Sequence, residues 1–243
     1  EKSLGPKTKV LMLNSPSNPS GMMYTEDEWR SLAKVIRSHE GLLVFSDDIY
    51  NRLVFNDEAL APHLLQVAPE LQSQCVLFNG VSKTYAMTGW RVGWSLGPEE
   101  VISAMTRYQS QSVSCACHIS QRAALAAIEG GEQELRTSLL TLKERRDFIY
   151  GELSKVEGVE VLAPQGAFYI WPNISAFLGR KYKGQVIKSS REFAANLLSD
   201  YSLSVVPGVE FGLEGYIRLS YALESSRMKE AVERLKSFTS QIS

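Results

Sequence analysis

A lysine and an arginine stand eight residues apart in the short segment Ser82–Gly93 of this 243-residue chain. Lys83 offers a primary amine, which forms a Schiff base with an aldehyde once the amine has lost its proton. Arg91 offers a planar guanidinium, which binds a phosphate through parallel hydrogen bonds. A small-residue turn precedes the lysine, and a Gly-Trp pair precedes the arginine. These two residue types are suited to holding a carbonyl group and a phosphate.

Two short apolar runs, Val10–Leu13 and Leu42–Phe45, predict strands of a buried parallel sheet. Between them, a capping-box pattern and apolar residues at helical spacing predict a helix over Glu26–His39. Strand, helix and strand form a right-handed βαβ unit. Open α/β sheets bind ligands beyond the carboxyl ends of their strands. The loop Asn14–Gly21 after the first strand is therefore a candidate site segment, and so is the polar segment after the second strand.

The rest of the chain continues to alternate predicted strands and helices. From Glu134 on, a long predicted helix is followed by shorter predicted strands. The further predicted elements are strands at Cys75–Phe78, Val92–Leu96, Val159–Val161, Ala167–Trp171 and Tyr216–Ser220, and helices after Pro98, from Glu134 to Leu153, after a second capping box at Ser189–Glu192, and over Ser226–Phe238. We predict an α/β fold with a mostly parallel sheet. Residues 1–134 form a partial large domain, and residues 135–243 form an interdomain helix with a smaller C-terminal domain.

Arg218 lies on the polar face of the predicted strand Tyr216–Ser220, whose other face is apolar. A half-buried arginine in such a position needs an anionic partner. That partner is either a carboxylate of a ligand or a structural ion pair with an acidic residue such as Glu224.

Taken together, the chain resembles the class I pyridoxal-phosphate-dependent aminotransferases, the aspartate aminotransferase family, in its bacterial-type branch. The segments that carry the resemblance are Asn14–Gly21, Asp47–Tyr50, Asn79–Gly93, Pro164–Tyr169, Val206–Gly208 and Tyr216–Ala222. They span essentially the whole chain. The resemblance implies the cofactor pyridoxal 5'-phosphate and an aspartate aminotransferase-like fold, in which a mostly parallel-sheet large domain precedes a smaller α/β domain.

The resemblance assigns the catalytic roles to Asp47, Tyr50 and Lys83. Lys83 forms the Schiff base and then carries a proton as general base and acid. An aspartate holds the pyridine nitrogen protonated, so that the ring acts as an electron sink. The family places this aspartate three residues before a tyrosine, which selects Asp47 with Tyr50. For Asp48 we expect an Asx turn or the cap of a following helix.

The resemblance also assigns the binding roles. Ser82 and Arg91 bind the cofactor's phosphate. Asn18, at the asparagine of the family's Asn-Pro-Thr-Gly loop, hydrogen-bonds the ring hydroxyl as Tyr50 does, and it lies at the substrate. Arg218 matches the arginine that grips the substrate's α-carboxylate.

Two positions depart from the commonest family pattern. Ser20 replaces a threonine, and Gly80 stands where the family often has a serine that contacts the phosphate. The bacterial branch also has glycine at this position, in an Asn-Gly-x-x-Lys run. The chain opens at Glu1 without a methionine, and the resemblance implies that several upstream elements of the large domain are absent. These include the helix N-terminus that cradles the phosphate. We therefore expect the isolated fragment to bind the cofactor poorly and to be inactive.

The composition limits the classes of partner. A formal net charge of -1 gives no basic surface for nucleic acid, and no apolar stretch is long enough to cross a membrane. Cys75, Cys115 and Cys117 lack metal-ligand spacing with the histidines, so we expect no metal and three reduced thiols. We expect a cytoplasmic protein. The resemblance implies a homodimer in the full-length protein, acting on small-molecule amino acids and 2-oxo acids.

The implied reaction is transamination from an amino acid, with aspartate favoured, to a 2-oxo acid such as 2-oxoglutarate. Within the same fold, a carbon–sulfur lyase or an aminocyclopropane carboxylate synthase shares Lys83, Asp47 and Arg218, and turnover of cystathionine against aspartate separates these enzymes. A non-catalytic aminotransferase-like sensing module, as in some transcription regulators, and an inactive fragment are further alternatives. The sequence does not fix the amino-acid specificity.

Overall fold

The structure of the chain is a computed structural model that describes residues 2–56 and 59–243. These residues divide into two compact units. The first unit holds the residues up to Ser17 together with Met22–Leu139, and the second holds Asn18–Gly21 together with Leu140–Ser243. The long predicted helix is α6 (Glu132–Leu153), and the division between the units falls within it.

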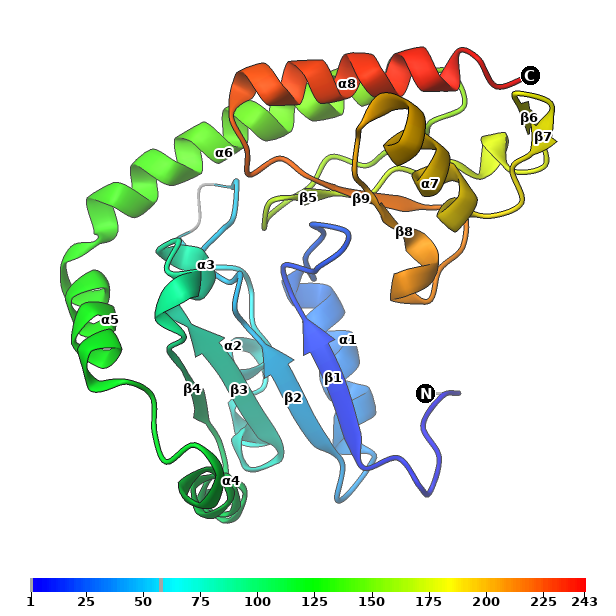
Figure 1. Cartoon of the computed structure of the whole chain (residues 1–243). Helices are drawn as coiled ribbons and strands as arrows, with labels where there is room; N and C mark the ends of the chain where they lie inside the picture. The colour runs from blue at the N-terminus through cyan, green and yellow to red at the C-terminus, as the bar shows by residue number, and fades with distance from the viewer. Residues whose placement is uncertain (1, 57–58) are drawn as a thin grey trace. The chain divides into compact units, whose positions relative to one another are not determined.

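The sheet of the first unit has four strands in the order β1-β2-β3-β4 (Figure 1). The first three, β1 (Val10–Asn14), β2 (Leu43–Asp47) and β3 (Cys75–Gly80), run parallel. The fourth, β4 (Gly93–Leu96), is antiparallel to β3. The predicted α/β fold with a mostly parallel sheet is therefore confirmed.

Helix α1 (Glu26–Arg37) begins at the predicted capping box. The Thr25 hydroxyl accepts from the Glu28 N–H, and the Glu28 carboxylate accepts from the Thr25 N–H at 2.8 Å. With α2 (Leu64–Val67) and the 3-10 turn η1 (Pro69–Gln74), α1 covers one face of the sheet. The core between them contains Leu13, Trp29, Ala33, Ile36, Val44, Leu64, Ala68, Leu71 and Cys75.

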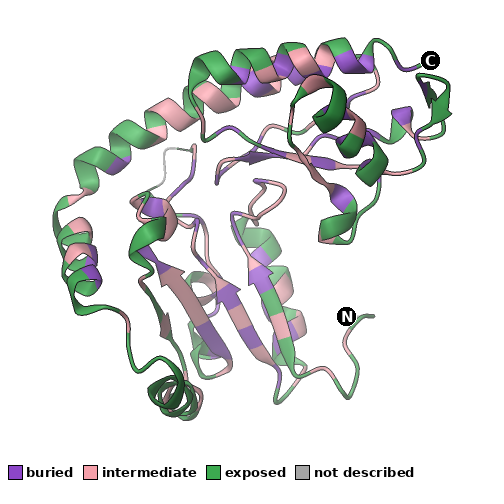
Figure 2. Ribbon diagram, viewed as in Figure 1, coloured by how far each residue is buried: buried purple, intermediate pink, exposed green. Residues whose placement is uncertain are grey.

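The opposite face of the sheet is far less enclosed. Met12 keeps 75% of its surface exposed, and Phe45 and Phe78 are half-buried. After β3 come the one-turn helix α3 (Val81–Thr84) and the 3-10 turn η2 (Thr88–Trp90). Helices α4 (Glu99–Ser112) and α5 (His118–Gly130) follow β4 and are largely exposed (Figure 2).

The second unit contains a small antiparallel sheet in the order β5-β9-β8. Its strands are β5 (Tyr169–Ile170), β9 (Ile217–Ser220) and β8 (Val206–Pro207), and a separate hairpin pairs β6 (Lys181–Tyr182) with β7 (Gln185–Val186). The helices are α7 (Ser190–Tyr201) and α8 (Ser225–Thr239), with 3-10 turns η3 (Ser175–Phe177) and η4 (Gly208–Phe211). The core of this unit includes Ile170, Phe193, Leu197, Ile217, Leu219, Leu235 and Phe238.

Two predicted strands of the second unit are wrong or too long. The segment Val159–Val161 pairs only through an isolated bridge from Glu160 to Asn173, and Pro164, which has no N–H, follows soon after. The strand predicted over Ala167–Trp171 shortens to β5, because Ala167 adopts a left-handed conformation with φ of 56°.

The second capping box forms only in part. Ser189 accepts from the Glu192 N–H at 3.2 Å, as predicted. The Glu192 carboxylate, however, accepts from the Lys188 N–H at 2.7 Å and not from that of Ser189. The Glu192 carboxylate therefore binds the backbone of Lys188, the residue before the cap.

Among residues 2–56 and 59–243, no helix combines the length and hydropathy that crossing a bilayer requires. Within the same ranges, no three histidine, cysteine or acidic side chains gather as metal ligands.

Candidate functional site

Asp47 is the last residue of β2, at the carboxyl end of the parallel strands. The Asn14 side-chain amide at the end of β1 donates to the Asp47 carbonyl oxygen at 2.8 Å. The Ile49 N–H donates to Asp47 Oδ1 at 3.2 Å. Burial raises the pKa of the Asp47 carboxyl, while the Ile49 N–H and the charge of Lys83 act to lower it. A nearby positive charge stabilises the ionised form of a carboxylate in this setting.

Lys83 and Tyr50 complete this charged group in the first unit. Lys83 lies on α3, immediately after β3, and its Nζ is 5.9 Å from the centroid of the Tyr50 ring. The Tyr50 side chain is buried, and the Lys83 side chain is half-buried. The structure thus brings together the amine, the phenol and the carboxylate of Lys83, Tyr50 and Asp47, three side chains that the sequence singled out.

Gly80 has a spatial reason for being a glycine. Its backbone is extended, with φ of -179°, so conformation does not require glycine. A Cβ there would lie 2.8 Å from the Val92 carbonyl oxygen and 3.0 Å from the Cα of Gly93. The close pairing of β3 with β4 therefore excludes a serine at position 80.

The two predicted phosphate ligands lie on either side of the turn η2. Ser82 is half-buried on α3. Arg91 is exposed with φ of 55°, and its Nη1 donates to the Thr88 carbonyl oxygen at 2.8 Å. That bond occupies one of five guanidinium donors, so Arg91 retains capacity to bind an anion.

Asp48 differs from the expected Asx turn or helix cap. Its side chain is buried, with 7% of the residue exposed, on the face of the sheet covered by α1 and α2. The Ser46 hydroxyl donates to Asp48 Oδ1 at 2.7 Å, and His63 Nε2 lies 3.3 Å from Asp48 Oδ2. The reason is the alternation of β2, which continues the buried face of Ser46 to Asp48.

His63 was not singled out by the sequence, although it is the partner that closes this buried network. Its Nδ1 accepts from the Leu65 N–H at 3.0 Å, so the neutral ring carries its proton on Nε2, toward Asp48 and Ser46. Burial lowers the pKa of His63 and raises the pKa of Asp48 to about 6. The available signal was the pattern His63-x-x-Gln66, whose glutamine accepts from the His63 N–H at 2.8 Å as in a capping box.

In the second unit, Arg218 projects from β9 between the buried residues Ile217 and Leu219. Its Nη1 donates to Asn18 Oδ1 at 2.8 Å. The structure therefore joins these two predicted substrate-binding residues directly. Within the described ranges, no salt bridge links Arg218 to Glu224, the alternative partner.

The loop that carries Asn18 is fixed within the second unit by Gly21. Its carbonyl oxygen accepts from the N–H groups of Gln165 and Gly166, both at 2.9 Å. Gly21 has φ of 69°, and a Cβ there would lie 2.7 Å from both the Pro164 Cβ and the Tyr169 carbonyl oxygen. Only glycine satisfies both demands.

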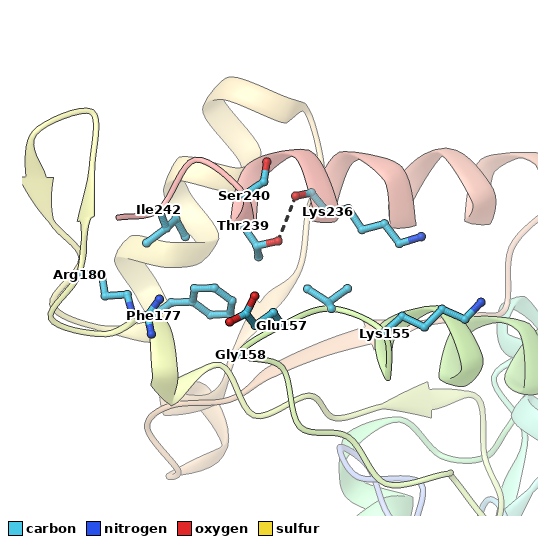
Figure 3. A pocket seen from close by; sticks show the side chains of 10 residues that line it. Lys155, Glu157, Gly158, Phe177, Arg180, Lys236, Thr239, Ser240 and Ile242 are labelled. Atoms are coloured by element: carbon cyan, nitrogen blue, oxygen red, sulfur yellow. Dashed lines mark hydrogen bonds between the residues drawn. The ribbon is translucent and has the colours of Figure 1, made fainter.

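A surface pocket of about 380 Å³ lies elsewhere on the second unit, between the segment after α6, η3 and the end of α8 (Figure 3). None of the predicted site residues lines it. Its Lys155 and Lys236 both bind Glu152, and the Thr239 hydroxyl donates to the Lys236 carbonyl oxygen. These polar groups already satisfy one another, which favours a structural role.

Comparisons with known proteins agree with this arrangement. The family model for aminotransferase class I and II matches residues 1–235. A probable aspartate/prephenate aminotransferase of Rickettsia felis is 41% identical over 100% of the chain and 59% of its own length. The crystal structure of the aspartate aminotransferase from Rhizobium meliloti has a TM-score of 0.95 at 37% identity, over 100% of this chain and 60% of that one. The chain thus spans about 59% of the length of these relatives.

Proposed function

Because this chain belongs to the aminotransferase class I and II family, we propose that its protein transfers an amino group from an amino acid to a 2-oxo acid with pyridoxal 5'-phosphate. The observation that carries the proposal is the meeting of Asp47, Tyr50 and Lys83 beyond the carboxyl ends of β2 and β3. A carboxylate, a phenol and a primary amine are the groups that a pyridine ring bearing a hydroxyl and an aldehyde requires.

Asp47 fits the ring nitrogen of this cofactor. When bound, pyridoxal phosphate supplies an electron sink for electrons released at the substrate's α-carbon. The Asp47 carboxylate is half-buried, its pKa is raised by burial, and it is stabilised by a positive charge beside it. We assign Asp47 to hold the ring nitrogen protonated, and Tyr50 and Asn18 to hydrogen-bond the ring hydroxyl.

Lys83 has two tasks in this proposal. Its Nζ would hold the cofactor at the aldehyde carbon through a C=N bond formed with loss of water, and the substrate's amine would displace it from that carbon. The released amine then moves a proton between the substrate's α-carbon and the cofactor's carbonyl carbon, as general base and then as general acid. Its position on α3 next to Tyr50 keeps it at the same strand ends as Asp47.

The binding roles go to side chains with hydrogen-bonding capacity to spare. Arg91 and Ser82 would bind the phosphate, and Arg91 keeps most of its donors open to solvent. Arg218 would bind the substrate's α-carboxylate through a bidentate fork. Asn18, which accepts from Arg218 Nη1, would orient that guanidinium.

Aspartate is the proposed amino donor, and 2-oxoglutarate is the proposed acceptor. Names of the relatives support this choice, since they are aspartate or aspartate/prephenate aminotransferases at 38–42% identity. These names make prephenate, itself a 2-oxo acid, the second acceptor to examine. A homodimer is part of the same proposal, and light scattering of the full-length protein would test it.

The test uses the protein expressed from the complete reading frame. We expect amino transfer from aspartate to 2-oxoglutarate, with no transfer by Lys83→Ala, because the covalent link and the proton carrier are lost together. Cystathionine is the matched alternative substrate. Release of sulfur products from cystathionine, without transfer from aspartate, would replace the transaminase proposal with a lyase.

A further inference from the structure

The guanidinium of Arg218 lies against two aromatic rings of the second unit. Its Cζ is 4.6 Å from the centroid of the Tyr169 ring and 5.1 Å from that of Phe211. Both distances are within the range of cation–π attraction. Arg218 Nε is buried and makes no hydrogen bond to any residue that the structure describes. The rings and Asn18 therefore constrain the guanidinium without using up its donors.

Phe211 is itself braced by other rings. The Trp171 ring meets it edge-on, with centroids 5.4 Å apart and planes at 89°. Trp171 in turn stacks on Tyr216, with centroids 5.4 Å apart and planes at 10°. The contacts form a continuous series from Tyr216 through Trp171 and Phe211 to Arg218.

The backbone of η4 determines where Phe211 stands. A Cβ on Gly208 would lie 2.3 Å from the Leu213 carbonyl oxygen and 2.7 Å from that of Tyr216. Gly212, directly after Phe211, has φ of 80°, and its N–H donates to the Val209 carbonyl oxygen. A side chain is therefore excluded at Gly208, and the positive φ of Gly212 favours glycine at the other end of the turn that presents Phe211 to β9.

Core packing alone does not account for Phe211. The residue is half-exposed, whereas Phe193 and Phe238 in the core of the same unit are fully buried. A half-exposed aromatic ring that is braced on one side and contacts a guanidinium on the other is suited to orienting that guanidinium.

We propose that Phe211, braced by Trp171 and Tyr216, is a positioning residue that holds the Arg218 guanidinium in the orientation that binds a substrate carboxylate. This inference rests on the proposed role of Arg218. The guanidinium lies within cation–π distance of the ring, while its outer donors stay available for two parallel bonds to a carboxylate. The ring also keeps water from that side of the guanidinium, which strengthens its bonds to an anion.

The kinetic test compares Phe211→Leu with Phe211→Tyr in the full-length enzyme. Loss of one cation–π contact predicts that Phe211→Leu raises the KM for aspartate by about 2- to 30-fold, with kcat changed less than KM. Phe211→Tyr retains the ring, and its KM should equal that of the wild type. In an Arg218→Lys background, which lacks the planar fork, Phe211→Leu should raise KM no further.

A second measurement on the 243-residue chain does not depend on activity. The Arg218 side-chain Nε–H, followed by NMR, should show a ring-shifted resonance and slow exchange with water. The ring shift should become smaller and the exchange faster in Phe211→Leu, where only the Tyr169 ring remains, and both properties should be kept in Phe211→Tyr. The melting temperatures of the two variants should be similar, because the residue is half-exposed.

The outcomes separate this inference from the proposed function. If Arg218→Lys raises the KM for aspartate and Phe211→Leu changes neither KM nor the Nε–H resonance, the positioning role of Phe211 is overturned and the role of Arg218 stands. If Arg218→Lys leaves KM unchanged, the proposed role of Arg218 fails and the inference fails with it. A KM effect of Phe211→Leu that persists in the Arg218→Lys background would also overturn it.

Discussion

Asp47 and Asp48 are neighbours in sequence, yet the two faces of the first unit's sheet give them different surroundings. Asp48 lies on the helix-covered face, where Ser46 and His63 lie against its two oxygens. Asp47 lies on the less enclosed face, with one backbone donor and the charge of Lys83. The alternation of a strand separates them. The difference leaves one carboxylate of this strand end half-buried on the less enclosed face and buries the next among polar partners on the covered face.

The largest difference between Asp47 and Asp48 should appear when the charge of each is removed in turn. Asp47→Asn keeps the shape of the side chain and loses the charge that would hold the ring nitrogen protonated. We expect it to lower kcat/KM of the full-length enzyme by about 10²–10³-fold, as for other removed electrostatic partners. Asp48→Asn is the matched control, and we expect it to stay within about tenfold of the wild type.

Both variants should be assayed on protein whose circular dichroism matches the wild type. Comparable losses from the two substitutions would show that the two faces do not divide the roles as we propose.

The stability of the chain should respond to pH through Asp48. Burial raises its folded pKa to about 6, above the ordinary value of 3.8, so the folded state keeps this proton to higher pH than the unfolded state. The free energy of unfolding should therefore fall as pH rises from about 4 to about 6, by up to about 3 kcal/mol from this group.

Urea unfolding of the 243-residue chain at pH 4.5 and pH 7 measures this change. The difference between wild type and Asp48→Asn isolates the Asp48 contribution, because the variant lacks the titrating carboxyl. An identical pH dependence in both proteins would contradict the assigned surroundings of Asp48.

His63 should matter for stability and little for activity. His63→Leu removes the Nε2–H that faces Asp48 and the Nδ1 that accepts from Leu65. Leaving a buried carboxylate with one donor fewer predicts a loss of about 1–3 kcal/mol in the free energy of unfolding at pH 7. A kcat/KM loss as large as that of Asp47→Asn would place His63 in the catalytic group. It would contradict the division of roles between the two faces of the sheet.

The smallest effect concerns the thiols. Cys75 lies in the core on the covered face, and burial raises its pKa to about 12. Cys115 and Cys117 are exposed. With iodoacetamide at pH 8, we expect alkylation of Cys115 and Cys117 in the folded chain and of Cys75 only in urea. Rapid labelling of Cys75 in native buffer would mean that the covered face opens readily.

The sequence predicted the four strands of the first unit and helix α1, because the strands are short apolar runs and α1 carries a local capping signal. Thr25 with Glu28 is this signal, and α1 begins there. The sequence did not predict α2, α3 and α5, and α3 and α5 have no side-chain cap. The second unit was harder, since the strand predicted over Ala167–Trp171 is interrupted by the left-handed backbone of Ala167. No local pattern encodes that conformation for an alanine.

For the site, the family resemblance selected Asp47, Tyr50 and Lys83, and the structure brings these three side chains near one another. The resemblance could not find the partners that come from distant segments. His63 reaches Asp48 only through the packing of α2 on the sheet, and Phe211 reaches Arg218 only through the turn η4. Such contacts depend on tertiary structure, which one sequence does not display.

We propose that Lys83 is the residue that bonds to pyridoxal phosphate. Borohydride reduction of the full-length protein in the presence of the cofactor, followed by peptide mapping, tests it directly. We predict one pyridoxyl group, on the peptide that contains Lys83, and no stoichiometric label in Lys83→Ala. A stoichiometric label on another lysine, or none on wild-type protein that turns over aspartate, would contradict the assignment.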